Sequence, residues 1–334
     1  MKHTLVYAGE LKQHYIIPPS GIPHNNIPGG DLLYAATGGK LWVDSITFLA
    51  RVGENFPSEW FSDFTKLGLN SRGIRVMPQY IESKTFESYD QHLVKNIKNP
   101  ASNYLKNGYS FPKELLNYSS DQEITDQKKL SNISSPRISD IPEELLGAKV
   151  LHLSPLELMS QTQLASFFQQ NNTTIISVDP HPDYMEQRYL PEIKNLLNGI
   201  TIFTPTEAQV RKIFWGSTND LWEMAERLSG YECEFVVIKL AKGGVAIFER
   251  ATKKKWQIPA YPSIIKDPSG CSAAFAGGVT AGFYLAFDIV EAVLYGNVTS
   301  SICSDGTGAA YIFEALPDLA RTRLKFHREQ IKRI

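Results

Sequence analysis

The sequence predicts an α/β protein with a mainly parallel central sheet and helices on both of its faces. Short apolar runs of buried-strand length alternate with amphipathic stretches along most of the 334 residues, which is typical of consecutive βαβ units. Hydrophobic residues make up 43% and charged residues 21% of the chain, close to the averages of globular proteins, so a disordered or fibrous chain is excluded. We expect a single domain over residues 1–334, built as a three-layer α/β/α body with a small β lid.

The period of the apolar residues sets the expected elements. Short runs rich in β-branched and aromatic residues are predicted as buried strands, and segments with apolar residues three and four apart as helices. The predicted strands are Leu5–Ala8, Ile46–Val52, Val150–Leu153, Thr174–Val178, Thr201–Phe203, Phe235–Leu240 and Val245–Phe248. The predicted helices are Pro57–Leu67, Glu157–Gln169, Asp220–Leu228, Ala273–Leu285 and Asp288–Ser301.

Two stretches depart from this alternation and predict the lid. Prolines and asparagines in Ile16–Ile27 indicate strand ends and turns, and the alternation in Lys84–Asp90 indicates antiparallel strand, so we place the lid at 12–27 and 74–92. A strand with a free edge is a template for pairing, so we expect a homodimer, or a heteromer with an active paralogue, through the lid. Residues 96–144 are polar and rich in Ser, Asn, Pro and Lys, which predicts a long surface excursion.

Charge and cysteine content limit the partners. The 34 basic and 35 acidic side chains give a net charge of -1, which predicts no partnership with nucleic acid or with an anionic membrane surface. The N-terminal apolar run is too short for a signal peptide, and no run reaches the roughly 18 apolar residues of a membrane span. The three cysteines lack CxxC spacing, which indicates neither a disulfide framework nor a zinc site. We therefore expect a cytoplasmic protein with a small-molecule ligand.

The most informative segment is a turn and small-residue helix, which reads DPSGCSAAFAGG from Asp267 to Gly278. The unpaired N–H groups of a first helical turn and the positive end of the helix dipole favour an anion, and small residues let it approach closely. We therefore predict an anion hole formed by the amides of Gly270, Cys271 and Ser272. By itself the segment also fits an ordinary, tightly packed helix N-terminus.

Together with other motifs, this segment resembles the PfkB, or ribokinase-like, family of carbohydrate and nucleoside kinases over nearly the whole chain. Pro28–Ala36 is similar to the family's glycine pair and the small-residue helix after it, and Arg51–Phe56 to its strand-end glycine and acidic turn. Ser177–Pro180 resembles the central strand that ends in Asp-Pro, and Phe203–Gln209 occupies the place of the Asn-x-x-Glu motif. Phe235–Gly244 resembles the strand and glycine turn that precede the nucleotide.

The resemblance implies a kinase of a sugar or nucleoside that uses ATP and Mg²⁺, with the lid strands covering the sugar. The substrate-binding residues would be His14, Gly29, Gly30 and Asp31. The nucleotide-binding residues would be Thr206, Lys239, Gly244, Asp267 and Asn297, and Glu207 would be the candidate metal ligand.

The chain departs from the family pattern at its catalytic base. The family's late motif ends in Gly-Ala-Gly-Asp, and its aspartate takes the proton from the substrate hydroxyl, whereas this chain has Ala273 at that position. Loss of a general base typically costs about 10²–10⁴ in rate, so we expect a catalytically impaired kinase scaffold. An active carbohydrate kinase with a relocated base and a non-catalytic interaction protein that works through residues 96–144 are the alternatives. The carboxylates considered for a relocated base are Asp179, Asp183, Glu207 and Asp267.

Other ligand positions differ as well. His14 stands where the family has an aspartate for sugar hydroxyls, and Ser272 replaces a glycine of the turn. Thr206 and Gln209 are uncharged in the metal motif, and Lys239 with Ala241 replaces the family's Thr and Gly near the nucleotide. These changes predict altered recognition of sugar, metal and ATP.

Overall fold

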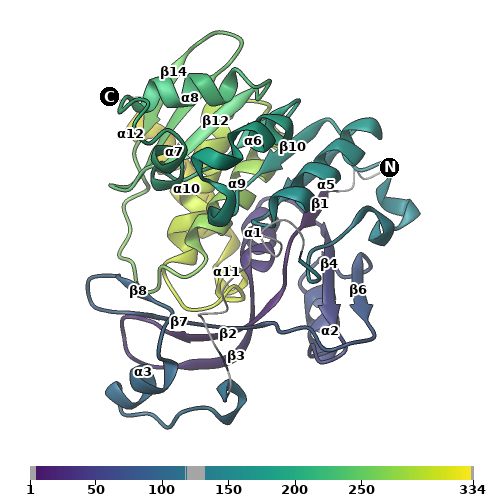
Figure 1. Ribbon diagram of the computed structural model, residues 1–334. Helices are drawn as coiled ribbons and strands as arrows, with labels where there is room; N and C mark the ends of the chain where they lie inside the picture. The colour runs from purple at the N-terminus through teal and green to yellow at the C-terminus, as the bar shows by residue number, and fades with distance from the viewer. Residues whose placement is uncertain (1–4, 117, 119–131, 332–334) are drawn as a thin grey trace.

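The computed structural model describes residues 5–116, 118 and 132–331. In this part of the chain the main sheet has ten strands: β1 Leu5–Ala8, β4 Ile46–Gly53, β5 Leu69–Asn70, β6 Ile74–Met77, β9 Val150–Leu153, β10 Ile175–Val178, β11 Ile202–Phe203, β12 Phe235–Lys239, β13 Val245–Glu249 and β14 Lys255–Ile258. Their order is β14-β13-β12-β11-β10-β9-β1-β4-β5, with β6 also beside β4 (Figure 1). All neighbours from β12 to β5 are parallel, and β13 and β14 add an antiparallel edge, which confirms the mainly parallel sheet.

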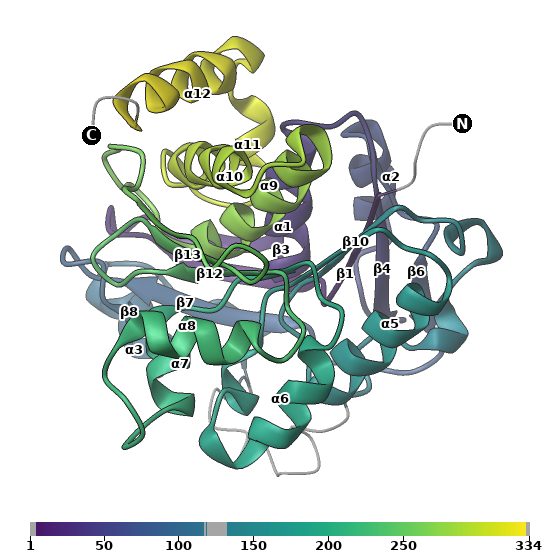
Figure 2. The ribbon, with the colours of Figure 1, turned by 90° about the horizontal axis from the view of Figure 1, so that it is seen from above.

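Helices cover both faces of this sheet. The helices are α1 Asp31–Lys40, α2 Glu59–Lys66, α3 Pro100–Lys106, α5 Leu158–Gln170, α6 Leu190–Leu197, α7 Glu207–Ile213, α8 Leu221–Ser229, α9 Cys271–Ala286, α10 Ile289–Cys303, α11 Tyr311–Glu314 and α12 Pro317–Ile331. Figure 2 shows α1, α9, α10 and α12 on one face, and α5, α6, α7 and α8 on the other. The three-layer α/β/α arrangement is therefore confirmed.

The strand residues feed two separate cores because successive side chains of a strand point to opposite faces. Leu5 and Tyr7 pack into the core beneath α1, α9 and α10, while Val6 and Ala8 pack into the core beneath α5, α6 and α8. All four side chains are buried, which is why this strand reads as a continuous apolar run rather than as an alternating one. Within the described residues no helix is long and apolar enough to cross a membrane.

The lid is a separate sheet with the order β3-β2-β7-β8, formed by β2 Lys12–Ile17, β3 His24–Gly29, β7 Lys84–Tyr89 and β8 Lys95–Asn96. It lies below the main sheet in Figure 1. The predicted antiparallel strand of the lid pairs in parallel with β2 and antiparallel with the short β8. Residues 74–77, predicted in the lid, instead form β6 of the main sheet, because β5 covers only the first two residues of β4 and leaves the edge at Ala50–Gly53 open.

The predicted surface excursion over 96–144 contributes to the interior at both of its ends, while 117 and 119–131 lie outside the described residues. Tyr104 and Leu115 are buried in a third, small core with three residues of the lid, Tyr15, Ile17 and Phe86. At the other end Asp140 forms a buried ion pair with Arg51 of β4. The excursion therefore packs against the lid near its start and contacts the main sheet near its end.

Candidate functional site

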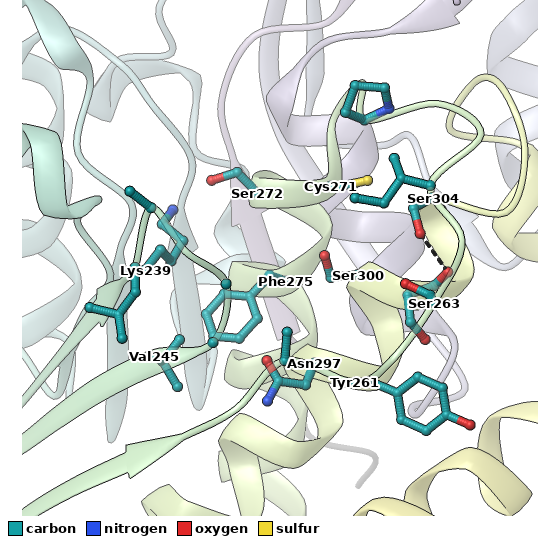
Figure 3. A pocket seen from close by; sticks show the side chains of 18 of the residues that line it. Lys239, Val245, Tyr261, Ser263, Cys271, Ser272, Phe275, Asn297, Ser300 and Ser304 are labelled. Atoms are coloured by element: carbon teal, nitrogen blue, oxygen red, sulfur yellow. Dashed lines mark hydrogen bonds between the residues drawn. The ribbon is translucent and has the colours of Figure 1, made fainter. Parts of the chain in front are cut away.

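A cavity of about 690 Å³ lies where the ends of β11 and β12 meet the first turn of α9 (Figure 3). Lys239 and Val245 stand on one side of it, and Cys271, Ser272 and Phe275 of α9 on the other. The residues that line it are Thr206, Glu207, Ala208, Lys239, Leu240, Ala241, Gly243, Gly244, Val245, Ala260, Tyr261, Pro262, Ser263, Ile265, Pro268, Cys271, Ser272, Phe275, Asn297, Ser300, Ser301 and Ser304. Apolar walls with a few polar groups are the usual composition of a small-molecule site.

The first turn of α9 supplies backbone donors to this cavity. Gly270 caps the helix with φ 68°, a left-handed conformation that glycine adopts without strain. The amide of Cys271 already donates to the carbonyl of Pro268 at 3.3 Å, whereas no acceptor among the described residues takes the amides of Ser272 and Ala273. Unpaired amides at the start of a 16-residue helix favour an anion. Of the predicted anion hole, Cys271 and Ser272 line the cavity and Gly270 does not.

Ala273 lies in the same first turn and is 3% exposed. It does not line the cavity, and its methyl group packs into the core beneath α9 and α10. A methyl group neither accepts a proton nor binds a metal, so this turn contributes donors to the site and no base.

Lys239 is the cationic side chain that β12 brings to the cavity, and it is paired with Asp179. Its ammonium lies 2.7 Å from a carboxylate oxygen of Asp179, and the two side chains are 13% and 5% exposed. Burial raises the pKa of Asp179, and the Lys239 ammonium opposes that rise. A phosphate in the cavity would therefore meet an ammonium that a buried carboxylate partly neutralises.

Thr206 and Glu207 begin α7 at the edge of the cavity. The Thr206 hydroxyl caps the helix by accepting from the amide of Gln209 at 3.2 Å, and the Gln209 side chain accepts from the Thr206 amide in return. One oxygen of Glu207 accepts from the amide of Ala241, and the other accepts from Arg211. These contacts, the Ala241 amide first, lower the pKa of Glu207. The candidate metal ligand is thus already engaged by protein donors.

Asn297 and Gly244 also line the cavity, while Asp267 does not. The side-chain amide of Asn297 donates to the carbonyl of Pro259 at 3.0 Å and lies 3.1 Å from the Nε2 of His327 on α12. Asp267 is fully buried in the loop before α9, where one of its oxygens accepts from the amide of Ser269 at 2.8 Å. Burial raises the pKa of Asp267.

The predicted substrate residues lie together in a different place, between the lid and α1. His14 is on β2, Gly29 ends β3, and Gly30 and Asp31 begin α1. The amide of Gly30 donates to the Nε2 of His14 at 3.1 Å. Burial lowers the pKa of His14, although the Glu87 and Asp31 carboxylates raise it. None of these predicted residues lines the cavity described above.

Sequence reasoning missed several residues of both regions. Phe275 and three serines of α10 and its end, Ser300, Ser301 and Ser304, line the cavity. Ser304 follows Ser301 by three residues and Ser300 by four, within and just past the predicted helix 288–301, and this helical spacing is a signal in the sequence. Tyr34, which packs against Gly270, lay inside a helix that was considered only for its small residues.

Comparison with known proteins places this arrangement in a family. The model for the pfkB family of carbohydrate kinases matches residues 24–315, which is most of the chain. The chain belongs to the pfkB family. The cytidine kinase of Thermococcus kodakarensis is 26% identical to it over 295 residues, which cover 87% of this chain and 92% of the relative.

Solved structures agree on the fold of this pfkB protein. A putative ribokinase II from E. coli, in complex with ATP and Mg²⁺, superposes with a TM-score of 0.70 at 15% identity, over 97% of this chain and all of that one. A ribokinase from Arabidopsis thaliana, complexed with ribose and ATP, superposes with a TM-score of 0.68 at 16% identity, over 97% of this chain and 99% of the other. These likenesses confirm the ribokinase-like fold.

The residues of the cavity fit a nucleotide better than they fit a metal ion. Apolar walls, amides at a helix start and an ammonium are groups that suit a base and phosphates. Within the described residues no group of three or more metal-ligating side chains occurs. The lining carboxylate, Glu207, has one protein donor on each of its oxygens, so Mg²⁺ would share it with Arg211 and the Ala241 amide.

Proposed function

We propose that this pfkB protein binds a nucleotide such as ATP in the cavity at the start of α9, and that it transfers the phosphoryl group weakly or not at all. The observation that carries the proposal is Ala273, a buried methyl group in the helical turn where the family's pattern has its base. Phosphoryl transfer depends on positioning and on stabilisation of charge, and the unpaired amide of Ser272, which lines the cavity, offers that stabilisation without a base.

The carboxylates considered for a relocated base support this proposal, because most of them are engaged elsewhere. Asp179 is paired with Lys239, and Glu207 bonds Arg211 and the amide of Ala241. The Asp183 carboxylate lies 3.7 Å from the ring of His181, on the short turn after β10. Each of them has a structural partner that accounts for its position.

Asp267 is the exception, and it favours an active kinase as the second candidate function. One of its oxygens is buried and has no hydrogen-bond partner in the described part of the chain, and burial raises its pKa, which makes it a stronger base. It precedes Gly270 by three residues. If the protein is an active kinase with Asp267 as its base, Asp267→Asn would abolish turnover. If it only binds a nucleotide, the same substitution would change no turnover, because there is none to lose.

The decisive experiment measures nucleotide binding and turnover separately, on a panel of sugars and nucleosides with ATP. We expect ADP and ATP to bind and turnover to fall at least about 10²-fold below the usual 1–100 per second of kinases. If the lost carboxylate is the main defect, Ala273→Asp, with or without Ser272→Gly, will gain about 10²–10⁴ in rate, while the isosteric control Ala273→Asn will not. Turnover of the unmodified chain at an ordinary kinase rate would refute the proposal.

Association through the lid remains part of the proposal. β8 covers β7 only at Ser88 and Tyr89, so among the described residues no other strand pairs with the rest of this edge of β7. The amide of Phe86 donates instead to the hydroxyl of Tyr118, which partly satisfies this edge. Light scattering at micromolar concentration distinguishes a homodimer from a monomer, and a mixture with an active paralogue tests the heteromer.

A further inference from the structure

We propose that the rings of His14 and Tyr34 fill the acceptor side of the molecule, which is the space between the lid and α1 where the family resemblance places the sugar or nucleoside. The protein then binds a nucleotide without a second, phosphate-accepting ligand. This inference rests on the proposed nucleotide binding, and it adds that a sugar or nucleoside does not bind beside the nucleotide. It is carried by contacts at three glycines, Gly29, Gly30 and Gly270, where a ligand would have to approach the backbone.

The His14 ring occupies the space beside the first glycine pair. A methyl group placed on Gly29 would lie 2.4 Å from the ring of His14, and one placed on Gly30 would lie 2.5 Å from the carbonyl oxygen of Glu10. The His14 Nε2 also takes the hydrogen bond of the Gly30 amide, at 3.1 Å. The His14 ring therefore packs directly on the backbone of Gly29, and the Gly30 amide that a ligand would use is already bonded to the same ring.

The Tyr34 ring occupies the corresponding space at the start of α9. A methyl group placed on Gly270 would lie 2.2 Å from the ring of Tyr34, which is 1% exposed. The centroids of the Tyr34 and His14 rings are 5.9 Å apart, so the two rings lie next to each other between the two helix starts. Together they bridge the glycines for which the family resemblance implies contact with the sugar and with the transferred phosphate.

The lid holds His14 in this position from behind. Residues Tyr15 and Ile17 of the same strand pack on its other face against Phe86, Tyr104 and Leu115, all of them buried. Because neighbouring residues of a strand point to opposite faces, this small core fixes the direction in which His14 points. Tyr104 and Leu115, from the described part of the excursion after the lid, thus help to hold the His14 ring against the glycines.

Polar atoms without partners, on the two rings and on residues near them in the chain, define the competing interpretation. Within the described residues, the buried Nδ1 of His14, the hydroxyls of Tyr34 and Thr85 and the hydroxyl of Ser269 have no hydrogen-bond partner. Such atoms could bind a small polar ligand, but the rings fill the volume beside the glycines that such a ligand would need. We therefore interpret the Thr85 and Ser269 hydroxyls as groups of a ligand site whose space the rings have taken, and expect these two hydroxyls to become available when a ring is removed.

The test is a calorimetric titration of the full chain with ADP, and with ribose, fructose and cytidine at up to millimolar concentration, with and without ADP. The unmodified chain should bind ADP and none of the other three. Tyr34→Ala should gain binding of at least one of them, by about tenfold or more in affinity, while its affinity for ADP changes less. The matched control is Tyr184→Ala, because Tyr184 is equally buried at 1% exposed but donates to Gln161 in the core of the opposite face.

The outcomes separate the two proposals. One-to-one binding of ribose, fructose or cytidine to the unmodified chain beside ADP would overturn the inference and leave nucleotide binding intact. Failure to bind ADP would overturn the proposed function, while the sugar and cytidine titrations would still report on the rings. If Tyr34→Ala does not fold, His14→Ala replaces it, since this change frees the Gly30 amide. A folded variant that gains no ligand would count against the inference.

Discussion

The cavity at the start of α9, on the nucleotide side, and the acceptor side between the lid and α1 both contain small residues, but the first is open and the second is filled. On the nucleotide side Gly244, Cys271 and Ser272 line a cavity of about 690 Å³. On the acceptor side Gly29 and Gly30 are buried beneath the ring of His14. Small residues permit close approach of whatever lies nearest, and this can be a ligand or a side chain of the protein itself. A glycine at a helix start is therefore evidence of close approach and not of an open site.

The comparison also separates two kinds of loss. Ala273 removes a proton acceptor without changing the backbone that offers amides to an anion. His14 and Tyr34 instead remove the space for the second substrate. Because this chain carries both, restoring the aspartate alone should give little turnover while the rings stay in place, since an acceptor must bind before its hydroxyl can lose a proton.

The largest expected effect lies on the nucleotide side, at the pair of Lys239 and Asp179. Lys239→Met leaves a buried carboxylate without its partner, and breaking a buried pair typically costs about 3–5 kcal/mol of stability. The control is Lys66→Met, whose pair with Asp63 has side chains 74% and 56% exposed and is worth at most about 1 kcal/mol. Urea unfolding measures both variants.

The same pair gives a dependence on pH with a definite sign. Burial raises the pKa of Asp179, and loss of the ammonium raises it further, so the folded variant holds its proton to a higher pH than the unfolded chain does. The loss in Lys239→Met should therefore be greatest above neutral pH and smaller in acid. An equal loss at pH 8 and pH 5 would mean that Asp179 finds another partner.

A smaller effect is expected at Gly270, where the two sides meet. Gly270→Ala combines a left-handed φ of 68° with contact against the Tyr34 ring, and should lower stability by about 2–4 kcal/mol. Gly216 has φ 73° and nothing within 4 Å of an added methyl, so Gly216→Ala isolates the backbone cost of about 1 kcal/mol. In a Tyr34→Ala background, Gly270→Ala and Gly216→Ala should lower stability by similar amounts. Similar losses in the unmodified background would argue that the ring does not press on Gly270.

The smallest expected effect is the loss of folding stability that His14 causes in acid. Burial lowers the pKa of its imidazole in the folded chain, so below the unfolded pKa of about 6.5 the unfolded chain takes up a proton that the folded one resists. Stability should therefore fall as the pH drops from 7 to 5, and less steeply in His14→Asn. Equal slopes in the two proteins would show that His14 is accessible to water.

Much of the body could be predicted from the sequence because its signals are local. Buried parallel strands read as apolar runs, and all seven predicted strands occur, each end within one residue of the prediction. β14 and α12 were missed, since Lys255–Ile258 is short and half exposed and α12 is polar along much of its length. The parallel pairing of β7 and the place of β6 in the main sheet depend on which edges other strands leave open, and no local pattern contains that information.

The candidate site divides in the same way. The sequence alone determined the small-residue turn before α9, the missing aspartate at Ala273 and the family to which these motifs belong. The tertiary structure decided which of these residues face open space: it brought Thr206, Lys239 and Asn297 to one cavity, engaged both oxygens of Glu207, and laid His14 and Tyr34 over the glycines. The physical reason is that backbone conformation and residue size are properties of a short segment, whereas accessibility depends on side chains that arrive from distant strands and helices.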